Sequence, residues 1–274
     1  MEIRKKEYEL GNVKRYSREV GTVISDGSKN RYAFELIVEN RPGIIFKIGE
    51  LFANKNINII HFTHSDANYN EAAIFVVGDF TNAKVSPKDL YAELEKNVPG
   101  VREIKHAGKV GSYFFSKHLF PITVDGNRVV MFGPANISGL LMGLRRNMGY
   151  AAPNILEHLG FSVGEELFRY YIESKNIPRE DIESILNLIG VLLITHGWGV
   201  LKKSEVKERS VTLEIDDLWE CYFYRKFGID DSSRYVLGII NGLFTTIYRR
   251  KVVVKEVTCI NKGGNTCRFE IHVL

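Results

Sequence analysis

The chain has 274 residues, enough for two domains that each bury a hydrophobic core. Hydrophobic residues make up 45% and charged residues 26%, as in ordinary globular proteins, and a formal net charge of +4 does not indicate a nucleic-acid partner. The longest apolar run, 188–195, is too short to cross a bilayer, the first residues are charged, and cysteines are few. We therefore expect a cytoplasmic protein that binds neither membrane nor nucleic acid.

Residues 1–30 are polar and basic, which predicts an N-terminal arm, and a domain follows over 31–108. Hydrophobic periodicity divides this domain into six elements. They are a strand over 32–38, a helix over 44–52, strands over 57–63 and 72–80, a helix over 87–98 and a strand over 101–105. The order βαββαβ predicts a ferredoxin-like fold.

This first domain resembles an ACT domain. The resemblance depends on the strand, turn and helix written FELIVENRPGII, and on the N-I-N-I segment that opens the second strand. It implies a site for a small ligand, typically an amino acid, at Gly43 and its neighbours Asn40 and Arg41. Glycine lets a ligand approach the backbone, and a helix N-terminus attracts a carboxylate. Two alternatives stay open: Pro42 and Gly43 only make the turn, or the domain serves assembly.

A second domain is expected over 112–274, with more helix than the first. A helix at 162–175 is predicted from the capping-box pattern of Ser162 and Glu165. The remaining expected elements are a hairpin over 120–132, apolar helical stripes over 137–148 and 155–159, a helix from 178 to 196, strands over 198–203 and 209–215, a helix over 233–248 and strands over 251–260 and 266–273. Gly238 and Gly242 stand four apart, so another helix is expected to pack closely against the helix over 233–248.

The last two predicted strands carry a cluster of potential metal ligands. Glu256, Cys259 and Cys267 form an E-x2-C-x7-C pattern across a turn rich in glycine and asparagine. Thiolate and carboxylate ligands suit zinc, which usually takes four. Residues three apart in a regular strand point to opposite faces, so Glu256 and Cys259 share an ion only across a bulge or strong twist. A Cys259–Cys267 disulfide or two packed free thiols are the alternatives.

The second domain resembles the V4R (4-vinyl reductase) family, whose fold is shared with a component class of the TRAPP vesicle-tethering complexes. The resemblance depends on the glycine–tryptophan–glycine turn at 197–199, the G-x3-G helix and the terminal E-V-x-C-x7-C-x-F pattern at 256–269. It implies an α+β protein in which a ferredoxin-like ACT domain precedes an α/β V4R domain. That order looks like an archaeal-type regulatory or sensor protein.

The resemblance also implies two sites in the second domain. Glu256, Cys259 and Cys267 would bind zinc, and the family's fourth ligand falls near Ser233, where Cys221 is the candidate substitute. The family's aromatic-ligand pocket implies His196, Trp198 and Trp219 as ligand-binding candidates. The alternative is that His196 bonds a carbonyl at the helix end and that both tryptophans belong to the core.

No catalytic residues are predicted, because nucleotide-binding and nucleophile motifs are absent from the sequence. We therefore expect a non-catalytic ligand sensor that binds a small hydrophobic or aromatic molecule, and an amino acid or an assembly partner at the ACT domain. A homodimer is expected. A structural homo-oligomer and an accessory subunit of a reductase are the alternatives.

Overall fold

A computed structural model describes residues 4–8, 14–18, 20–21, 23–25, 30–65 and 70–274. The chain forms two compact units, one of residues 17–130 and one of residues 1–16 together with 131–274. Within the expected arm over 1–30, residues 1–3, 9–13, 19, 22 and 26–29 lie outside the described residues. Among the described arm residues, β1 (Arg4–Glu7) pairs with β11 (Val200–Lys207), and β2 (Val23–Ser25) pairs with β8 (Tyr113–Phe115). The division therefore differs from the expected boundaries, because each unit takes a strand from the first 30 residues.

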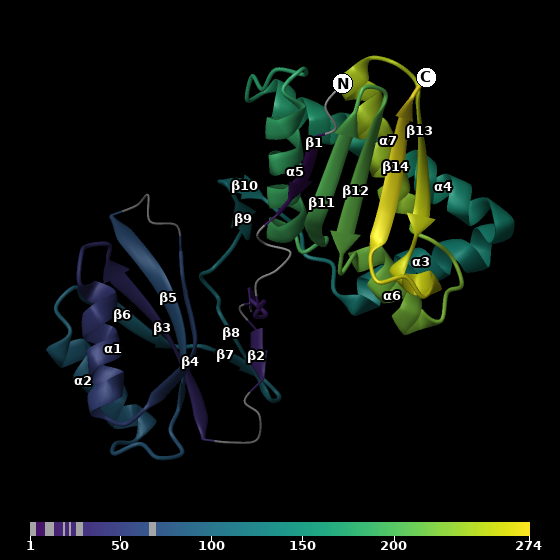
Figure 1. Cartoon of the computed structure of the whole chain (residues 1–274). Coiled ribbons are helices and arrows are strands. Elements are labelled where there is room, and N and C mark those ends of the chain that lie inside the picture. Colours follow the sequence, from purple (N-terminus) through teal and green to yellow (C-terminus); the bar gives the residue numbers. More distant parts are fainter. Residues whose placement is uncertain (1–3, 9–13, 19, 22, 26–29, 66–69) are drawn as a thin grey trace. The chain divides into compact units, whose positions relative to one another are not determined.

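The unit of residues 17–130 contains the predicted βαββαβ order. Its elements are β3 (Arg31–Glu39), α1 (Ile44–Asn54), β4 (Asn58–His64), β5 (Glu71–Asp79), α2 (Pro87–Asn97) and β6 (Val101–His106). The strands form an antiparallel sheet of order β4-β5-β3-β6. Both helices cover one face of this sheet, where Ile48, Phe52 and Leu90 are buried against Leu36 and Ile74 (Figure 1). The ferredoxin-like prediction is confirmed.

The fold of this unit continues past residue 108. The strands β7 (Gly108–Val110) and β8 (Tyr113–Phe115) join β2 in a small sheet, and Phe114 packs with Phe75 and Val77 of the larger sheet. Buried Glu35 accepts hydrogen bonds from the Ser116 hydroxyl at 2.6 Å and the Lys117 amide at 2.7 Å. A short hairpin of β9 (Thr123–Val124) and β10 (Asn127–Arg128) follows.

The other unit is built on a five-stranded antiparallel sheet of order β1-β11-β12-β14-β13. The strands are β11 (Val200–Lys207), β12 (Ser210–Asp216), β13 (Val252–Thr258) and β14 (Cys267–Val273), with β1 at one edge. Alternate residues of β12, Val211, Leu213 and Ile215, are buried in one core. Because side chains alternate between the faces of a strand, these residues place the core on one face of the sheet.

Helices complete this unit. They are α3 (Pro134–Met148), α4 (Ala152–Leu167), α5 (Ile182–Thr195), α6 (Trp219–Phe227) and α7 (Arg234–Tyr248). The prediction of a helix start at Ser162 is wrong: α4 begins with Pro153 in its first turn, runs through Ser162 and continues as a π-helix over Phe168–Glu173. The helix α6 was not predicted. None of the described helices combines the length and apolar character that crossing a membrane requires.

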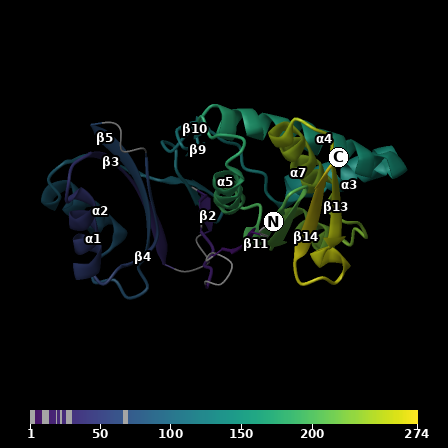
Figure 2. The ribbon, with the colours of Figure 1, turned by 45° about the horizontal axis from the view of Figure 1, so that its top comes forward.

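The helices α4 and α7 lie side by side, as seen in Figures 1 and 2. Gly160 and Gly164 of α4 face Gly238 and Gly242 of α7. A Cβ atom on any of the four would come within 2.0 to 2.1 Å of a carbonyl oxygen on the opposite helix. No side chain fits at that distance, so glycine is required for this approach. The expected close packing of the G-x3-G helix is confirmed, and its partner carries the same spacing.

Candidate metal centre and apolar cavity

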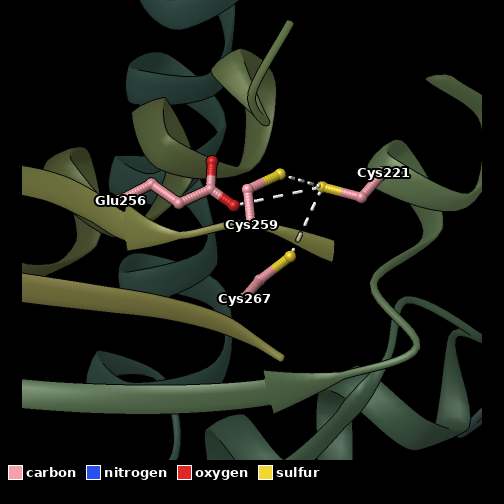
Figure 3. Close-up of side chains that lie close together, drawn as sticks. All are labelled: Cys221, Glu256, Cys259 and Cys267. Atoms are coloured by element: carbon pink, nitrogen blue, oxygen red, sulfur yellow. Dashed lines mark hydrogen bonds between the residues drawn. The ribbon is translucent and has the colours of Figure 1, made fainter. Parts of the chain in front are cut away.

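Four potential metal ligands from three elements meet in the interior of the second unit. Cys221 comes from α6, Glu256 from β13, Cys259 follows β13 directly, and Cys267 begins β14 (Figure 3). The Sγ atom of Cys221 lies 3.3 Å from that of Cys259 and 3.4 Å from that of Cys267. One ligand atom of each residue falls within 4.8 Å of the others, and all three cysteines are buried and free of disulfides.

A β-bulge lets Glu256 and Cys259 reach the same point. The register of β13 against β14 shifts between Glu256, which pairs with Phe269, and Thr258, which pairs with Arg268. The extra residue, Val257, shifts the alternation of side chains by one position, so Cys259 lies on the same face as Glu256. The sequence requirement for a bulge or twist is therefore met.

The turn after Cys259 is shaped around its carbonyl oxygen. The amides of Lys262 and Gly264 donate to this oxygen at 3.0 and 2.9 Å. Gly263 has φ of 89°, and a Cβ on Gly264 would lie 2.9 Å from the same oxygen. Both positions favour glycine. The Ile260 amide donates to the Cys267 sulfur at 3.5 Å, which further ties the two cysteines together.

Ser233 supports the carboxylate of Glu256 and does not join the sulfur atoms. Its amide and its hydroxyl each donate to Oε2 of Glu256 at 2.8 Å. The other oxygen, Oε1, lies 4.0 Å from the Cys221 sulfur. The family's fourth position falls near Ser233, and Cys221 was the expected substitute; the geometry brings Cys221 to the three other residues, while Ser233 contacts only the carboxylate of Glu256.

Glu220 fixes the adjoining helices, and the sequence analysis missed it. Its fully buried carboxylate accepts the first three amides of α7, those of Arg234, Tyr235 and Val236, at 3.0, 3.0 and 2.9 Å. It also accepts the Tyr224 hydroxyl at 2.6 Å. A carboxylate at a helix N-terminus satisfies unpaired amides and faces the positive end of the helix dipole. The only hint of this role in the sequence is that Glu220 directly precedes Cys221.

The cluster cannot hold four negative charges in a buried site without a cation. Hydrogen bonds from the Cys221 and Cys267 thiols lower the pKa of Cys259 to about 2. Hydrogen bonding to Cys259 raises the pKa of Cys221, and hydrogen bonding to Cys221 raises that of Cys267. Burial raises the pKa of Glu256 to about 8. One thiolate surrounded by protonated neighbours is therefore the metal-free state near neutral pH.

This donor set could hold a metal ion. Three sulfurs and one carboxylate oxygen match the number and the kinds of ligand in a closed zinc site. Sulfurs bound to one zinc at about 2.3 Å lie about 3.8 Å apart, so the observed separations need only open slightly. The charge of a divalent cation would replace the protons that the metal-free cluster retains.

The Glu256 carboxyl and a bound zinc ion are expected to change stability with pH in opposite directions. Without metal, folded Glu256 holds a proton that the unfolded carboxyl releases above its ordinary pKa of 4.5, so its contribution to the free energy of unfolding falls as pH rises from about 4.5 to about 8. The Cys259 thiolate contributes in the opposite sense over this window, because the unfolded thiol keeps its proton up to its ordinary pKa of 9.0, so the metal-free wild type should show little net slope. Zinc requires deprotonated ligands, so its stabilising contribution grows over the same window. Urea unfolding at pH 5 and pH 8, with chelator or with zinc, measures both slopes. Metal-free Glu256→Gln should gain stability with rising pH relative to the metal-free wild type, and identical metal-free slopes for the two proteins would contradict this assignment.

An apolar cavity of about 60 Å³ lies in the core of the same unit. Its lining comes from α5, α7, β12, the end of α4 and the π-helix. The lining residues are Leu167, Tyr171, Ile172, Leu188, Ile189, Leu192, Leu193, Trp198, Leu213, Ile215, Val236, Ile239, Ile240, Leu243 and Phe244. No cysteine of the chain is among them.

Tyr171 and His196 supply polar groups beside this cavity. The Tyr171 hydroxyl lies 3.5 Å from Nε2 of His196, and Nδ1 of His196 donates to the Leu192 carbonyl at 3.0 Å. Because a carbonyl oxygen only accepts, Nδ1 carries the hydrogen of this bond, and Nε2 is the acceptor whenever the ring is neutral. His196 thus bonds a carbonyl at the helix end, as its alternative reading expected. Tyr171, which the sequence analysis did not consider, comes from the π-helix, a feature often found at functional sites.

The two tryptophans lie in different places. Trp198 lines the cavity, with its ring centroid 5.8 Å from that of His196. Trp219 does not line it and packs instead against Phe223 and Tyr235. Its buried Nε1 has no hydrogen-bond partner within the described part of the chain. The structure therefore brings His196 and Trp198 together and leaves Trp219 apart from them.

The candidate residues of the first unit lie at the turn before α1. Gly43 has φ of 87° and precedes α1, whose N-terminus no described side chain caps. Arg41 donates to the Pro99 carbonyl at 2.7 Å and pairs with Glu39 at 3.2 Å. The amide of Asn40 donates to the Asn70 carbonyl at 2.9 Å. All three residues thus support the turn, and a Cβ on Gly43 would meet open space.

Comparison with known proteins defines the first unit. The family model of the ACT domain matches residues 32–98. The chain therefore contains an ACT domain and has a mixed α/β architecture. No curated protein matches the sequence significantly.

Several solved structures are similar in fold. The phenol-responsive sensory domain of the transcription activator PoxR with phenol is 16% identical over 54% of this chain and 77% of its own, with a TM-score of 0.46. A vinyl-4-reductase family protein from Methanocaldococcus jannaschii is 17% identical over 48% and 79%, with a TM-score of 0.30. The ACT domain from GTP pyrophosphokinase of Chlorobium tepidum is 15% identical over 28% and 97%, with a TM-score of 0.23.

Proposed function

We propose that this protein is a non-catalytic, ligand-responsive regulator whose second unit binds a small apolar or aromatic molecule. The observation that carries the proposal is the apolar cavity with Tyr171 and His196 beside it. Apolar walls with a few convergent polar groups are typical of small-molecule sites. The terminal cysteine pattern and the V4R resemblance support the same reading.

The size of the cavity limits the ligand. An engineered apolar cavity of about 150 Å³ binds benzene, so a cavity of 60 Å³ must widen to admit even a single ring. A long acyl chain would need far more displacement. A phenol-sized molecule is therefore the proposed class, with its ring against Trp198 and its hydroxyl toward Tyr171 and His196.

Phenol is expected to raise the unfolding midpoint of the wild-type protein and to bind more weakly to Tyr171→Phe. Loss of one hydrogen bond of about 1 kcal/mol corresponds to an affinity loss of roughly fivefold. Isothermal titration with phenol measures this loss, and benzene should bind both proteins equally. Tyr170→Phe, a neighbour that does not line the cavity, is the matched control. Equal phenol affinities for Tyr171→Phe and wild type would exclude the proposed orientation.

We further propose that the cluster of Cys221, Glu256, Cys259 and Cys267 binds zinc as a structural ion. When bound, zinc would supply cross-linking of α6 to the β13–β14 hairpin. Glu256 would bind through Oε1 while Ser233 holds Oε2. All four donors belong to protein side chains, so the site leaves no open position for catalysis.

At the ACT domain we propose that an amino acid binds beside Gly43. The uncapped N-terminus of α1 and the open space at Gly43 support this proposal. Thermal-shift measurements with individual amino acids are expected to find one that stabilises the wild-type chain but not Gly43→Val. If none stabilises the wild type, the ACT domain serves assembly instead.

A further inference from the structure

The cysteine cluster and the apolar cavity are built on the same helix. Ser233 directly precedes α7 and donates twice to Glu256, and Glu220 holds the first three amides of that helix. Val236, within the same first turn, lines the cavity. The N-terminus of α7 is therefore at once the support of a cluster carboxylate and part of the cavity wall.

Two further connections join the cluster to the cavity. Cys267 pairs directly with Ile215 across β14 and β12, and Ile215 lines the cavity. The Trp219 amide, two residues before Cys221, donates to the carbonyl of cavity-lining Trp198 at 2.9 Å. The elements that carry Cys221 and Cys267 are thus each joined by backbone pairing to a residue that lines the cavity.

The middle of α7 is held separately. Its glycines lie against α4 at a distance that permits no side chain. This close packing holds the middle of α7 against α4, independently of the cysteine cluster. The N-terminal turn depends instead on Glu220, Ser233 and the cluster. Without an ion the cluster is joined by thiol hydrogen bonds, which are weak, whereas an ion would fix the carboxylate of Glu256 and with it the first turn of α7.

We propose that an ion in the cluster and a ligand in the cavity bind with positive coupling through the N-terminal turn of α7. This inference rests on the two sites proposed above. A ligand that enters a cavity with an ordered wall spends less free energy on ordering it, so the ion strengthens ligand binding. By thermodynamic reciprocity the ligand strengthens ion binding by the same factor.

The test uses zinc and phenol with the full chain. The phenol dissociation constant is expected to be at least about fivefold lower for zinc-loaded than for chelator-treated protein, the lower end of ordinary coupling. Equal affinities, or weaker binding to the zinc-loaded form, would overturn the coupling alone. Absence of phenol binding to both forms would overturn the cavity proposal together with the coupling.

A second measurement needs only the folded, zinc-loaded protein. Phenol is expected to slow zinc release to a chromogenic chelator, because a ligand that holds the first turn of α7 in place opposes the loosening of Glu256 that release requires. Ser233→Ala should keep the zinc stoichiometry but reduce this effect, because the hydroxyl bond to Glu256 is lost while the amide bond remains. Ser232→Ala is the matched control, since among the described residues no hydrogen bond joins its side chain to the cluster. An unchanged release rate with phenol in the wild type, or full retention of the effect in Ser233→Ala, would refute the link.

Discussion

Cys267→Ser is expected to lower zinc affinity at least 100-fold, and the free energy of unfolding in zinc by about 2.7 kcal/mol for a 100-fold loss and about 4 kcal/mol for complete loss. Cys267 is fully buried, and its sulfur lies 3.4 Å from that of Cys221. A ligand present at 1,000 times its dissociation constant stabilises the folded state by about 4.1 kcal/mol, and a hydroxyl replaces a thiolate poorly in a closed zinc site. Zinc competition titrations and urea unfolding in zinc measure the two effects.

Thr266→Ser is the matched control for that substitution, because it changes the neighbouring side chain of the same hairpin and removes no cluster ligand. It should bind zinc like the wild type. If Cys267→Ser binds zinc with wild-type affinity, Cys267 is not a ligand, and the cluster proposal fails.

Gly242→Ala is expected to destabilise the fold by at least about 3 kcal/mol, although alanine in an ordinary helix interior is better than glycine by about 0.5–1 kcal/mol. The added Cβ would lie 2.0 Å from the Phe161 carbonyl oxygen, so α7 and α4 would have to separate. Overpacking of this kind forces the backbone to move. Urea unfolding monitored by circular dichroism measures the loss.

Gly143→Ala provides the opposite case. Gly143 lies in α3 with nothing within 4 Å of an added Cβ, so alanine should stabilise the protein by about 0.5–1 kcal/mol. A stable Gly242→Ala protein would mean that the two helices do not pack as closely as the structure has them.

Much of the fold was predictable because its patterns are local. The period of apolar residues in 31–105 gives the ACT order, and Gly238 and Gly242 predict a close helix contact. The helix α6 was missed because its core-facing residues include Glu220, a charged residue whose burial depends on amides of α7, far along the chain. The false start at Ser162 shows that a capping pattern also occurs inside a helix, where Ser162 is exposed.

The candidate site was predictable in part for the same reason. Glu256, Cys259 and Cys267 are near one another in sequence, and the needed bulge follows from their spacing. Cys221 joins the cluster through the tertiary position of α6. Its distance along the sequence from the other three residues gave no signal, so it was expected only as the substitute for the family's fourth ligand. Tyr171 lines the cavity from the π-helix. The spacing of apolar residues in the sequence does not distinguish a π-helix from an α-helix, so this position was not predicted.

The central claim is that one chain holds zinc at the four-residue cluster and a phenol-sized ligand in the cavity. Native mass spectrometry of protein purified with zinc and then mixed with phenol reports both, together with subunit number, for which we expect a homodimer. The account predicts a single zinc and a single phenol per chain, with zinc absent in Cys267→Ser. Protein that carries neither zinc nor phenol under these conditions would contradict the account.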